Sequence, residues 1–191
     1  MSARRGMLFV ISGPSGVGKD AVIEKLVAQD PNIRRSVSYT TRAPRRGERD
    51  GVDYSFVTRE EFERLIDDGE FLEFATYDGN LYGTSARRVA ALESAGSDVI
   101  LKIDVKGAEQ VRQRLPDATF IFLEPPSMQE LIRRTTSRQT ESAEDRSARQ
   151  MIAEVEMKYA PHYDHVVVND QLDRAVAEVL AIINGVRGQK V

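Results

Sequence analysis

The sequence predicts an α/β fold in which a parallel sheet carries a phosphate-binding loop. Short apolar runs alternate along the chain with helical patterns, as they do where strands and helices follow one another in a layered domain. A glycine-rich segment at residues 13–19 separates the first predicted strand from the first predicted helix. The 191 residues suffice for one domain with a sizeable core, and the absence of cysteine excludes disulfides, thiol catalysis and cysteine-ligated zinc.

The predicted core elements follow from these patterns in chain order. Residues 7–11 form a continuous apolar run, which predicts a buried strand at 7–12, and residues 18–29 follow it as a helix. Residues 172–183 place apolar side chains at helical spacing and predict the last helix. The apolar runs between them predict further buried strands, and one long charged stretch predicts helix: strands at 99–103, 118–123 and 165–168, and helix at 127–159.

The segment at residues 37–88 differs in composition from the rest of the chain and is rich in Thr, Arg, Tyr, Gly and Asp. Its apolar runs at 54–57 and 71–74 are short and predict a small, half-exposed sheet that carries polar residues into a pocket. Between them, Thr58 and Glu61 have the spacing of a capping box, and Gly69 marks the end of that helix. No internal repeat or low-complexity linker interrupts the chain, so this segment is interpreted as an insertion in one domain.

The charge balance and the apolar runs exclude several classes of protein. The chain has 27 Lys and Arg residues against 30 Asp and Glu residues, and this net charge of −3 argues against broad nucleic-acid coating. No apolar stretch approaches the length of a membrane span, and the apolar run at residues 7–11 is too short for a secretory signal. We therefore expect a cytoplasmic protein that binds neither nucleic acid nor membrane.

The strongest motif is the P-loop pattern G-x-x-x-x-G-K. Its residues are Gly13, Pro14, Ser15, Gly16, Val17, Gly18 and Lys19. Glycines let backbone N–H groups turn inward around anionic oxygens, and the N-terminus of the following helix favours negative charge. Lys19 would reach the β- and γ-phosphates of a nucleotide. The alternative is a glycine-rich turn without a ligand, which the order strand, loop, helix makes the weaker interpretation.

Two acidic residues are candidates for the metal side of such a site. Asp20 stands where the motif has Ser or Thr, whose hydroxyl binds Mg²⁺. A carboxylate is itself a good ligand for Mg²⁺, but Asp20 could equally be an acid favoured by the helix dipole. Asp104 ends a predicted strand, which suits either a carboxylate facing metal and substrate or a simple turn residue.

A second anion site is predicted around Arg42 and Arg45. These arginines lie three residues apart in a segment rich in hydroxyl groups, close enough to converge on one anion. The segment alone would fit a solvated basic loop or a nucleic-acid patch. Beside a P-loop, a second phosphate clamp is what a nucleotide-to-nucleotide phosphotransferase needs.

Over residues 7–185 the chain resembles the guanylate kinase family of the bacterial type. The resemblance rests on the P-loop and a series of further motifs. These are residues 36–48, Gly51-Val52-Asp53-Tyr54-Ser55-Phe56, Glu70-Phe71-Leu72-Glu73-Phe74, Tyr82-Gly83-Thr84, Ile103-Asp104-Val105-Lys106-Gly107-Ala108, Arg138-Gln139-Thr140-Glu141 and Val168-Asn169-Asp170-Gln171-Leu172.

The resemblance implies a P-loop nucleoside monophosphate kinase fold that transfers the γ-phosphoryl group of ATP to GMP or dGMP, with Mg²⁺, giving ADP and GDP or dGDP. The implied parts are a core of residues 1–36, 89–124 and 159–191, a GMP-binding region at 37–88 and a helical lid at 125–158. The implied partners are the small molecules ATP and GMP. Whether the protein is a monomer or a homo-oligomer stays open.

The same resemblance assigns roles to single residues. Arg42, Arg45 and Tyr54 would hold the GMP phosphate, and the guanine would be read by Ser38, Glu73, Thr84 and Asp104, with Tyr82 at the same pocket. Guanine offers two adjacent N–H donors that the Glu73 carboxylate can accept as a pair, whereas adenine leaves it partly unpaired.

The lid arginines implied by the resemblance are Arg134, Arg138 and Arg149, which would stabilise charge on the transferring phosphoryl group. As ordinary residues, they would form an exposed helical face paired with nearby acids. Asn169 is placed at the adenine side, although it would also suit a cap for the last helix.

The chain departs from the family pattern at Asp20 and at three further positions. Lys102 stands where the family often has an acid, Lys106 where it usually has Gln, and Gln139 where it usually has Gly. Three alternatives to a guanylate kinase stay open. A nucleic-acid-binding P-loop protein is the weakest, because the net charge of −3 disfavours it. Ribose 1,5-bisphosphate phosphokinases can carry Asp after the P-loop lysine but lack the complete arginine–tyrosine–glutamate pocket. Non-catalytic guanylate-kinase-like modules tend to lose the P-loop.

Overall fold

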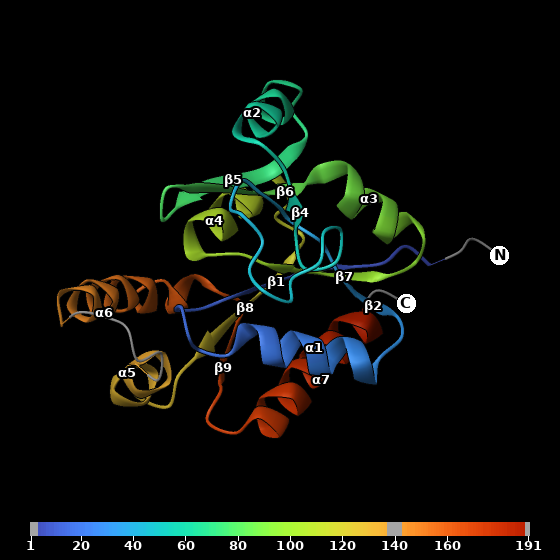
Figure 1. Ribbon diagram of the computed structural model, residues 1–191. Coiled ribbons are helices and arrows are strands. Elements are labelled where there is room, and N and C mark those ends of the chain that lie inside the picture. Colours follow the sequence, from blue (N-terminus) through green and yellow to red (C-terminus); the bar gives the residue numbers. More distant parts are fainter. Residues whose placement is uncertain (1–3, 137–142, 190–191) are drawn as a thin grey trace. The chain divides into compact units, whose positions relative to one another are not determined.

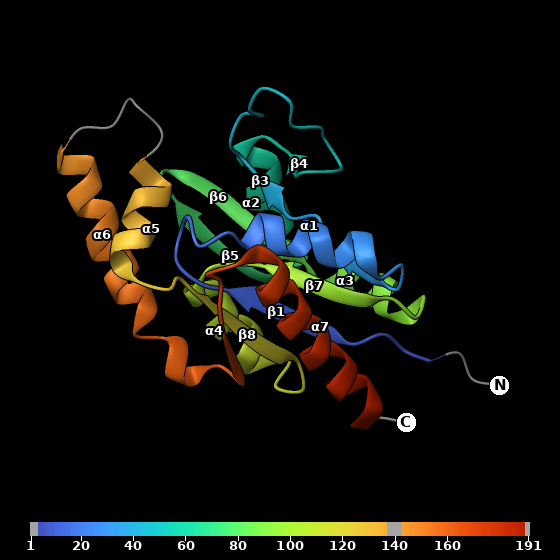
Figure 2. The ribbon, with the colours of Figure 1, turned by 90° about the horizontal axis from the view of Figure 1, so that it is seen from below.

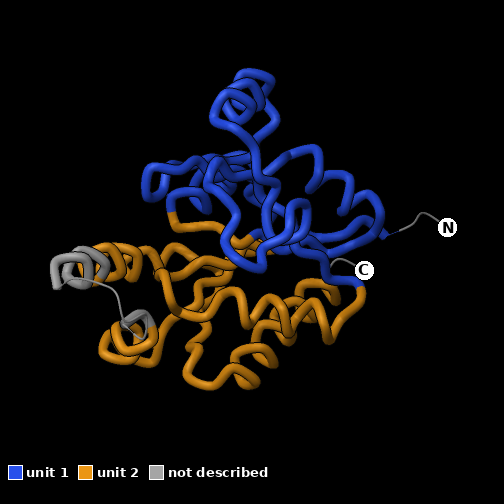
Figure 3. The backbone as a smooth tube through the Cα atoms, in the orientation of Figure 1, with its two compact units in different colours: residues 1–8, 32–101, 106–118 blue, residues 9–31, 102–105, 119–191 orange. Residues whose placement is uncertain are grey.

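The computed structural model describes residues 4–136 and 143–189 (Figure 1). Its contacts divide the chain into two compact units, coloured separately in Figure 3. Unit 1 consists of Met1–Leu8, Asn32–Leu101 and Lys106–Ala118. Unit 2 consists of Phe9–Pro31, Lys102–Val105 and Thr119–Val191. Each unit therefore contains segments that are distant in the sequence.

Unit 2 is built on parallel strands, as the sequence predicts. β1 (Leu8–Ser12) pairs in parallel with β8 (Thr119–Glu124), which pairs in parallel with β9 (His165–Val168). All five residues of β1 are buried, which explains why its apolar run is continuous rather than alternating.

Two helices close the core of unit 2. α1 (Lys19–Gln29) packs against α7 (Leu172–Gln189), and Figures 1 and 2 show the two helices side by side. α1 buries Leu26 and α7 buries Val179, both without exposed surface. The last helix was predicted correctly in place but ends later than predicted, because its final turns lack the apolar spacing that marked its start.

The helical stretch predicted at residues 127–159 contains two helices, α5 (Met128–Thr136) and α6 (Ala143–Met157), and residues 137–142 between them lie outside the described residues. A 3-10 turn, η1 (Ala160–His162), follows. Pro161 lies in that turn, where its missing N–H is tolerated. None of the helices in the described ranges, 4–136 and 143–189, is long and apolar enough to cross a membrane.

Unit 1 contains a small sheet of four strands in the order β4-β3-β6-β5. The strands are β3 (Tyr39–Thr40), β4 (Ser55–Phe56), β5 (Phe71–Tyr77) and β6 (Asn80–Ser85). β5 and β6 form an antiparallel hairpin whose turn residues, Asp78 and Gly79, have φ angles of 49° and 72°. Positive φ at both positions is what a two-residue hairpin turn requires. This hairpin brings polar residues of two strands face to face.

A helix and a hydrophobic cluster support that sheet. α2 (Arg59–Asp67) begins with the predicted capping box: the Thr58 hydroxyl accepts from the Glu61 N–H at 3.1 Å, and the Glu61 carboxylate accepts from the Thr58 N–H at 2.8 Å. Phe62 of this helix stacks on Phe71 of β5, with 4.5 Å between ring centroids. The hairpin is therefore held from one side by a packed aromatic core.

Of the remaining elements of unit 1, β7 was predicted from the sequence, whereas β2, α3 and α4 were not. β2 (Ile33–Arg35) pairs in parallel with β7 (Asp98–Lys102), the predicted strand at 99–103. α3 (Ala86–Ser94) follows β6 directly and is capped by the Ser85 hydroxyl, which accepts from the Arg88 N–H at 3.0 Å. α4 (Val105–Arg114) follows β7.

Candidate active site

The P-loop of unit 2 has the conformation that its glycines suggested. Gly13, Gly16 and Gly18 have φ angles of 144°, 85° and 99°, a region that side chains rarely adopt. A Cβ on Gly13 would lie 2.3 Å from the carbonyl oxygen of Leu123, and a Cβ on Gly18 would lie 2.6 Å from Asn169 Nδ2. Glycine is thus required both for the turn and for close packing. Gly18 also caps α1, so the loop leads directly into a helix N-terminus.

Lys19 is the first residue of α1 and is partly buried. Its Nζ donates to the carbonyl oxygens of Gly13 at 2.5 Å and Pro14 at 3.1 Å. Burial lowers the pKa of Lys19 to about 8, and the positive charge of Lys102 contributes in the same direction. The carboxylates of Glu156, Asp20 and Asp104 oppose this shift and raise the pKa. The loop therefore holds a partly buried ammonium group whose charge an anionic ligand would stabilise.

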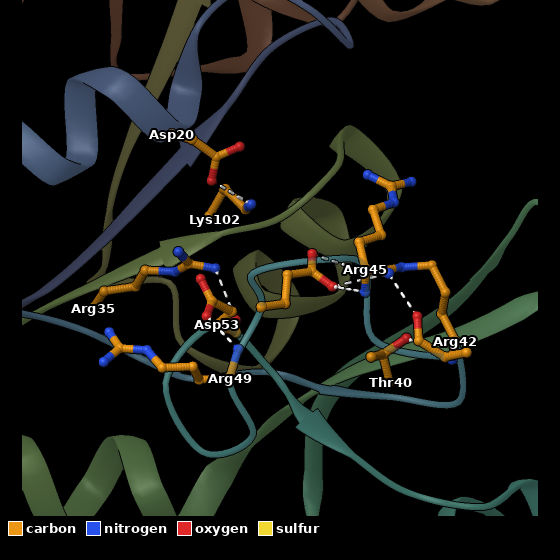
Figure 4. A network of polar contacts seen from close by, with 10 residues as sticks. Asp20, Arg35, Thr40, Arg42, Arg45, Arg49, Asp53 and Lys102 are labelled. Carbon is orange, nitrogen blue, oxygen red and sulfur yellow. Dashed lines mark hydrogen bonds and ion pairs between the residues drawn. The ribbon is translucent and has the colours of Figure 1, made fainter.

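Asp20 contacts a residue to which the sequence analysis gave no role. Lys102 Nζ, at the end of β7, donates to Asp20 Oδ1 at 2.5 Å, as Figure 4 shows. The lysine side chain is 16% exposed and the aspartate side chain is 61% exposed. Lys102 had been noted only as a departure from the family pattern. Its ion pair with Asp20 forms because the fold brings together segments that are 82 positions apart, and local sequence patterns do not show such contacts.

Asn169 and Arg134 meet beside the P-loop. The Asn169 side chain is buried and donates from Nδ2 to the carbonyl oxygen of Val17 at 2.8 Å. Asn169 lies three residues before α7, so the helix-cap interpretation is wrong and its side chain instead ties down the loop. Arg134 donates from Nη1 to the Asn169 carbonyl oxygen at 2.9 Å and from Nε to Glu130 at 2.8 Å.

The structure leaves two of the predicted lid arginines untested. Arg138 lies outside the described residues, and Arg149 belongs to α6 but its side chain lies outside them. Two arginines of α5, Arg133 and Arg134, hold Glu130, and their hydrogen bonds lower the pKa of that carboxyl to about 2.

In unit 1, Arg42 is held in place by a carboxylate that the sequence analysis did not single out. Glu48 accepts from both terminal nitrogens of Arg42, at 2.9 and 3.0 Å, and from the Arg45 backbone N–H at 2.7 Å. These hydrogen bonds lower the pKa of Glu48 and raise that of Arg42. Glu48 is the last residue of the arginine-rich motif at residues 36–48. Its spacing of six residues from Arg42 was the sequence signal from which this ion pair could have been predicted.

Aromatic rings surround the same guanidinium group. The Arg42 Cζ atom lies 5.5 Å from the centroid of the Tyr54 ring, and Tyr54 meets Tyr82 edge to face at 5.9 Å. A hydrogen bond with Tyr82 also raises the pKa of Arg42. The structure therefore brings together Arg42, Tyr54 and Tyr82, three of the residues predicted for one substrate.

Glu73 and Thr84 form a buried polar pair on the β5–β6 hairpin. The two residues are direct cross-strand partners, next to a register shift between Phe71 and Glu73. Thr84 Oγ1 donates to Glu73 Oε1 at 2.6 Å, and both residues are almost inaccessible to solvent. This hydrogen bond fixes one carboxylate oxygen, so the carboxylate has a defined orientation.

The remaining predicted residues lie near these features in the chain. Ser38 directly precedes β3, and its carbonyl oxygen accepts from the Ser55 N–H at 2.8 Å. Ser38 thus joins the sheet that carries Tyr82. Asp104 belongs to unit 2, where its charge acts on Lys19.

The acidic side chains near the P-loop fit a hard divalent cation only in combination with a ligand. Among the described residues, no group of three or more His, Asp or Glu side chains is arranged to hold a metal ion. Asp20 and Asp104 still offer carboxylate oxygens within electrostatic range of Lys19. A magnesium ion here would take its other ligands from phosphate oxygens and water, as Mg²⁺ does in nucleotide sites.

Comparisons with known proteins agree with this geometry. The family model for guanylate kinase matches residues 5–185. Guanylate kinase of Halalkalibacterium halodurans is 48% identical over 183 residues, which cover 96% of this chain and 90% of the relative. Guanylate kinase of Neisseria meningitidis is 50% identical over 188 residues, covering 98% and 92%. The crystal structure of guanylate kinase from Anaplasma phagocytophilum superposes with a TM-score of 0.79 at 34% identity, covering 97% of this chain and 88% of that one.

These matches help to decide between a guanylate kinase and the alternative protein classes that the sequence left open. They extend over almost the whole chain and favour neither a ribose 1,5-bisphosphate phosphokinase nor a non-catalytic binding module. They also agree with the parallel-sheet core and the P-loop described above. The chain belongs to the guanylate kinase family and is an ATP:GMP phosphotransferase.

Proposed function

We propose that the P-loop of unit 2 binds ATP and that the small sheet of unit 1 binds GMP for in-line transfer of the γ-phosphoryl group. The observation that carries this proposal is the polar face of the small sheet. There, the buried Glu73–Thr84 pair shares its hairpin with Tyr82, which contacts Tyr54 beside Arg42. The residues of a base reader and of a phosphate clamp therefore lie on the small sheet or directly next to its strands.

In the proposed GMP site, Arg42, Arg45 and Tyr54 hold the phosphate, and Glu73 accepts from the guanine N1–H and N2–H groups. The Thr84 hydroxyl occupies one lone pair of Glu73 and leaves the carboxylate oriented toward the base. Ser38, Tyr82 and Asp104 complete the proposed contacts. Adenine offers an acceptor at N1, so a buried carboxylate would be left partly unpaired opposite it.

In the proposed ATP site, backbone N–H groups of residues 13–18 surround the phosphates and Lys19 contacts the β- and γ-phosphates. Phosphate oxygens would replace the carbonyl groups that now accept from Lys19. Asn169, Arg134, Arg138 and Arg149 complete the proposed contacts on the adenine side and over the transferring group. Mg²⁺ would be held by the phosphates with Asp20 nearby, and when bound it would neutralise charge that develops during transfer.

This chemistry needs no general base from the protein. The GMP phosphate is already an anion at neutral pH, so the chain contributes positioning, charge neutralisation and exclusion of water. We assign the core to residues 1–36, 89–124 and 159–191, the GMP-binding region to 37–88 and the lid to 125–158. Both nucleotides are cytoplasmic metabolites, in keeping with the predicted cytoplasmic location, and no role in nucleic-acid binding is proposed.

Replacing Arg42 with lysine tests the proposed phosphate clamp. Lysine keeps the positive charge but cannot donate two parallel hydrogen bonds to two oxygens of one group. Arg42 now donates such a pair to the Glu48 carboxylate. We expect the KM for GMP to rise roughly tenfold or more while the KM for ATP stays within about twofold. Arg59→Lys, at an exposed arginine of α2, is the matched control and leaves both values unchanged. A KM for GMP equal to that of the native protein would contradict the clamp.

A further inference from the structure

The P-loop of this protein carries an acid at the position next to its lysine. Backbone N–H groups, a helix N-terminus and Lys19 all make this loop attractive to anions. Asp20 places a carboxylate in the first turn of the same helix, where it would repel the phosphates of a nucleotide. The loop can bind a polyphosphate strongly only if that negative charge is offset.

Lys102 lies where it can offset this charge. Its ammonium nitrogen is 2.5 Å from Asp20 Oδ1, while most of its side chain is shielded from solvent. The two residues are 82 positions apart, so the pair is a tertiary contact within unit 2 and not a neighbour effect. Lys102 also lies close enough to Lys19 for the two positive charges to repel each other. Two neighbouring lysines that are both largely shielded from solvent are unfavourable unless a carboxylate compensates them.

We propose that Lys102 is the positioning residue that makes Asp20 compatible with nucleotide binding, by neutralising its carboxylate beside the P-loop. This inference rests on the proposed function, in which the loop binds the phosphates of ATP or ADP. The pair acts as one unit: removing the lysine takes from Asp20 the ion-pair partner that offsets its charge toward the nucleotide, and removing both charges restores the original balance.

The pair also predicts how nucleotide binding depends on a divalent cation. With Lys102 in place, Asp20 has a cation of the protein's own. Without Lys102, the carboxylate needs another cation, and Mg²⁺ bound with the nucleotide phosphates supplies one. Loss of Lys102 should therefore weaken binding most when no divalent ion is present.

The test is ADP binding to the full-length protein by titration calorimetry, in EDTA and in Mg²⁺. We compare native protein, Lys102→Gln, Asp20→Asn and the double variant. In EDTA, we expect Lys102→Gln to weaken ADP binding about tenfold and Asp20→Asn to strengthen it severalfold. The double variant is expected to return to within about threefold of native, and in Mg²⁺ the loss caused by Lys102→Gln should shrink.

Two further variants separate charge from structure. Lys102→Arg keeps the cation and is expected to bind ADP within about threefold of native. Lys25→Gln is the control: Lys25 lies on α1 outside the P-loop and pairs with Asp173 of α7. Its substitution should leave ADP affinity unchanged. Thermal unfolding of each variant checks the fold. If Lys102→Gln does not fold, the increase in affinity expected for Asp20→Asn still decides the question.

Three results would overturn the inference. The double variant could bind ADP as weakly as Lys102→Gln alone, which would mean that Lys102 acts on the nucleotide itself. Asp20→Asn could weaken binding in EDTA, or the Lys102→Gln loss could be equal with and without Mg²⁺. Failure of the proposed function would look different, because native protein and Lys19→Met would then bind ADP equally.

Discussion

Lys19→Met is expected to lower the turnover of ATP and GMP by about 10³-fold while the protein stays folded. Lys19 is the partly buried ammonium group of the P-loop, and its donors are now directed at the carbonyl oxygens of Gly13 and Pro14. In the reaction, these donors would stabilise the charge on the phosphoryl group as it transfers. Methionine fills similar space without charge, so the electrostatic contribution is lost together with the two hydrogen bonds to the loop carbonyls.

The same substitution is expected to change stability in a pH-dependent way. Burial lowers the pKa of Lys19 from 10.5 to about 8, so above pH 8 the unfolded chain binds a proton that the folded protein has lost. Folding of the native protein is therefore penalised at pH 7, by about 3 kcal/mol on this shift, and the penalty is relieved as the pH rises toward 10. Relative to native, Lys19→Met should be more favourable at pH 7 than at pH 10.

Chemical unfolding at both pH values and a coupled ADP-release assay measure these two effects. Lys25→Met is the matched control, because Lys25 belongs to the same helix but forms an exposed ion pair with Asp173. It should keep native turnover. Substantial turnover by Lys19→Met, with the fold intact, would contradict the assignment of Lys19 to the transferring phosphate.

Glu73→Gln is expected to reduce the preference for GMP over AMP by about 10²-fold. The carboxylate of Glu73 is buried and oriented by Thr84, so it can accept two N–H donors at a fixed place. Glutamine replaces one acceptor by a donor, which opposes one guanine N–H and leaves a buried group unpaired. We expect kcat/KM for GMP to fall, with a much smaller change for the poor substrate AMP.

Glu70→Gln provides the matched control for this experiment. Glu70 precedes β5 and accepts from the Ser85 hydroxyl, so it repeats the Glu73–Thr84 arrangement at the edge of the same hairpin. Its substitution should leave base preference unchanged. If Glu73→Gln kept the native ratio of kcat/KM for GMP and AMP, Glu73 would not read the base.

The P-loop and the capped helix could be predicted because their signals are local. A continuous apolar strand, glycines at fixed spacing and Lys19 define the loop, and Thr58 with Glu61 defines the start of α2. These features depend on residues within a few positions of one another. Their physical causes, buried backbone and unsatisfied N–H groups, act over the same short range.

The hairpin of β5 and β6 was predicted only in its first strand. Asp78-Gly79 is a strong turn signal, but the second strand carries Gly83 between polar residues and lacks a clear apolar alternation. The structure explains this: a Cβ on Gly83 would lie 2.8 Å from the Phe71 ring, so packing selects glycine there. Tertiary packing determined this strand rather than strand propensity.

The candidate site was predicted in its residues but not in its electrostatic partners. Arg42, Glu73 and Lys19 stand out by motif, whereas the pairing of Lys102 with Asp20 becomes visible only once the chain is folded. The lowered pKa of Lys19 follows from burial, which a sequence does not report. Charges whose partners lie far along the chain are therefore the part that sequence reasoning could not supply.

The central claim is that one buried carboxylate selects guanine at a site built for phosphoryl transfer. The most direct measurement is ADP release by the native protein with ATP, Mg²⁺ and each of GMP, AMP, CMP and UMP as acceptor. We predict rapid ADP release with GMP and kcat/KM values lower by at least about 10²-fold with the other three. Comparable release with AMP and GMP would contradict the claim.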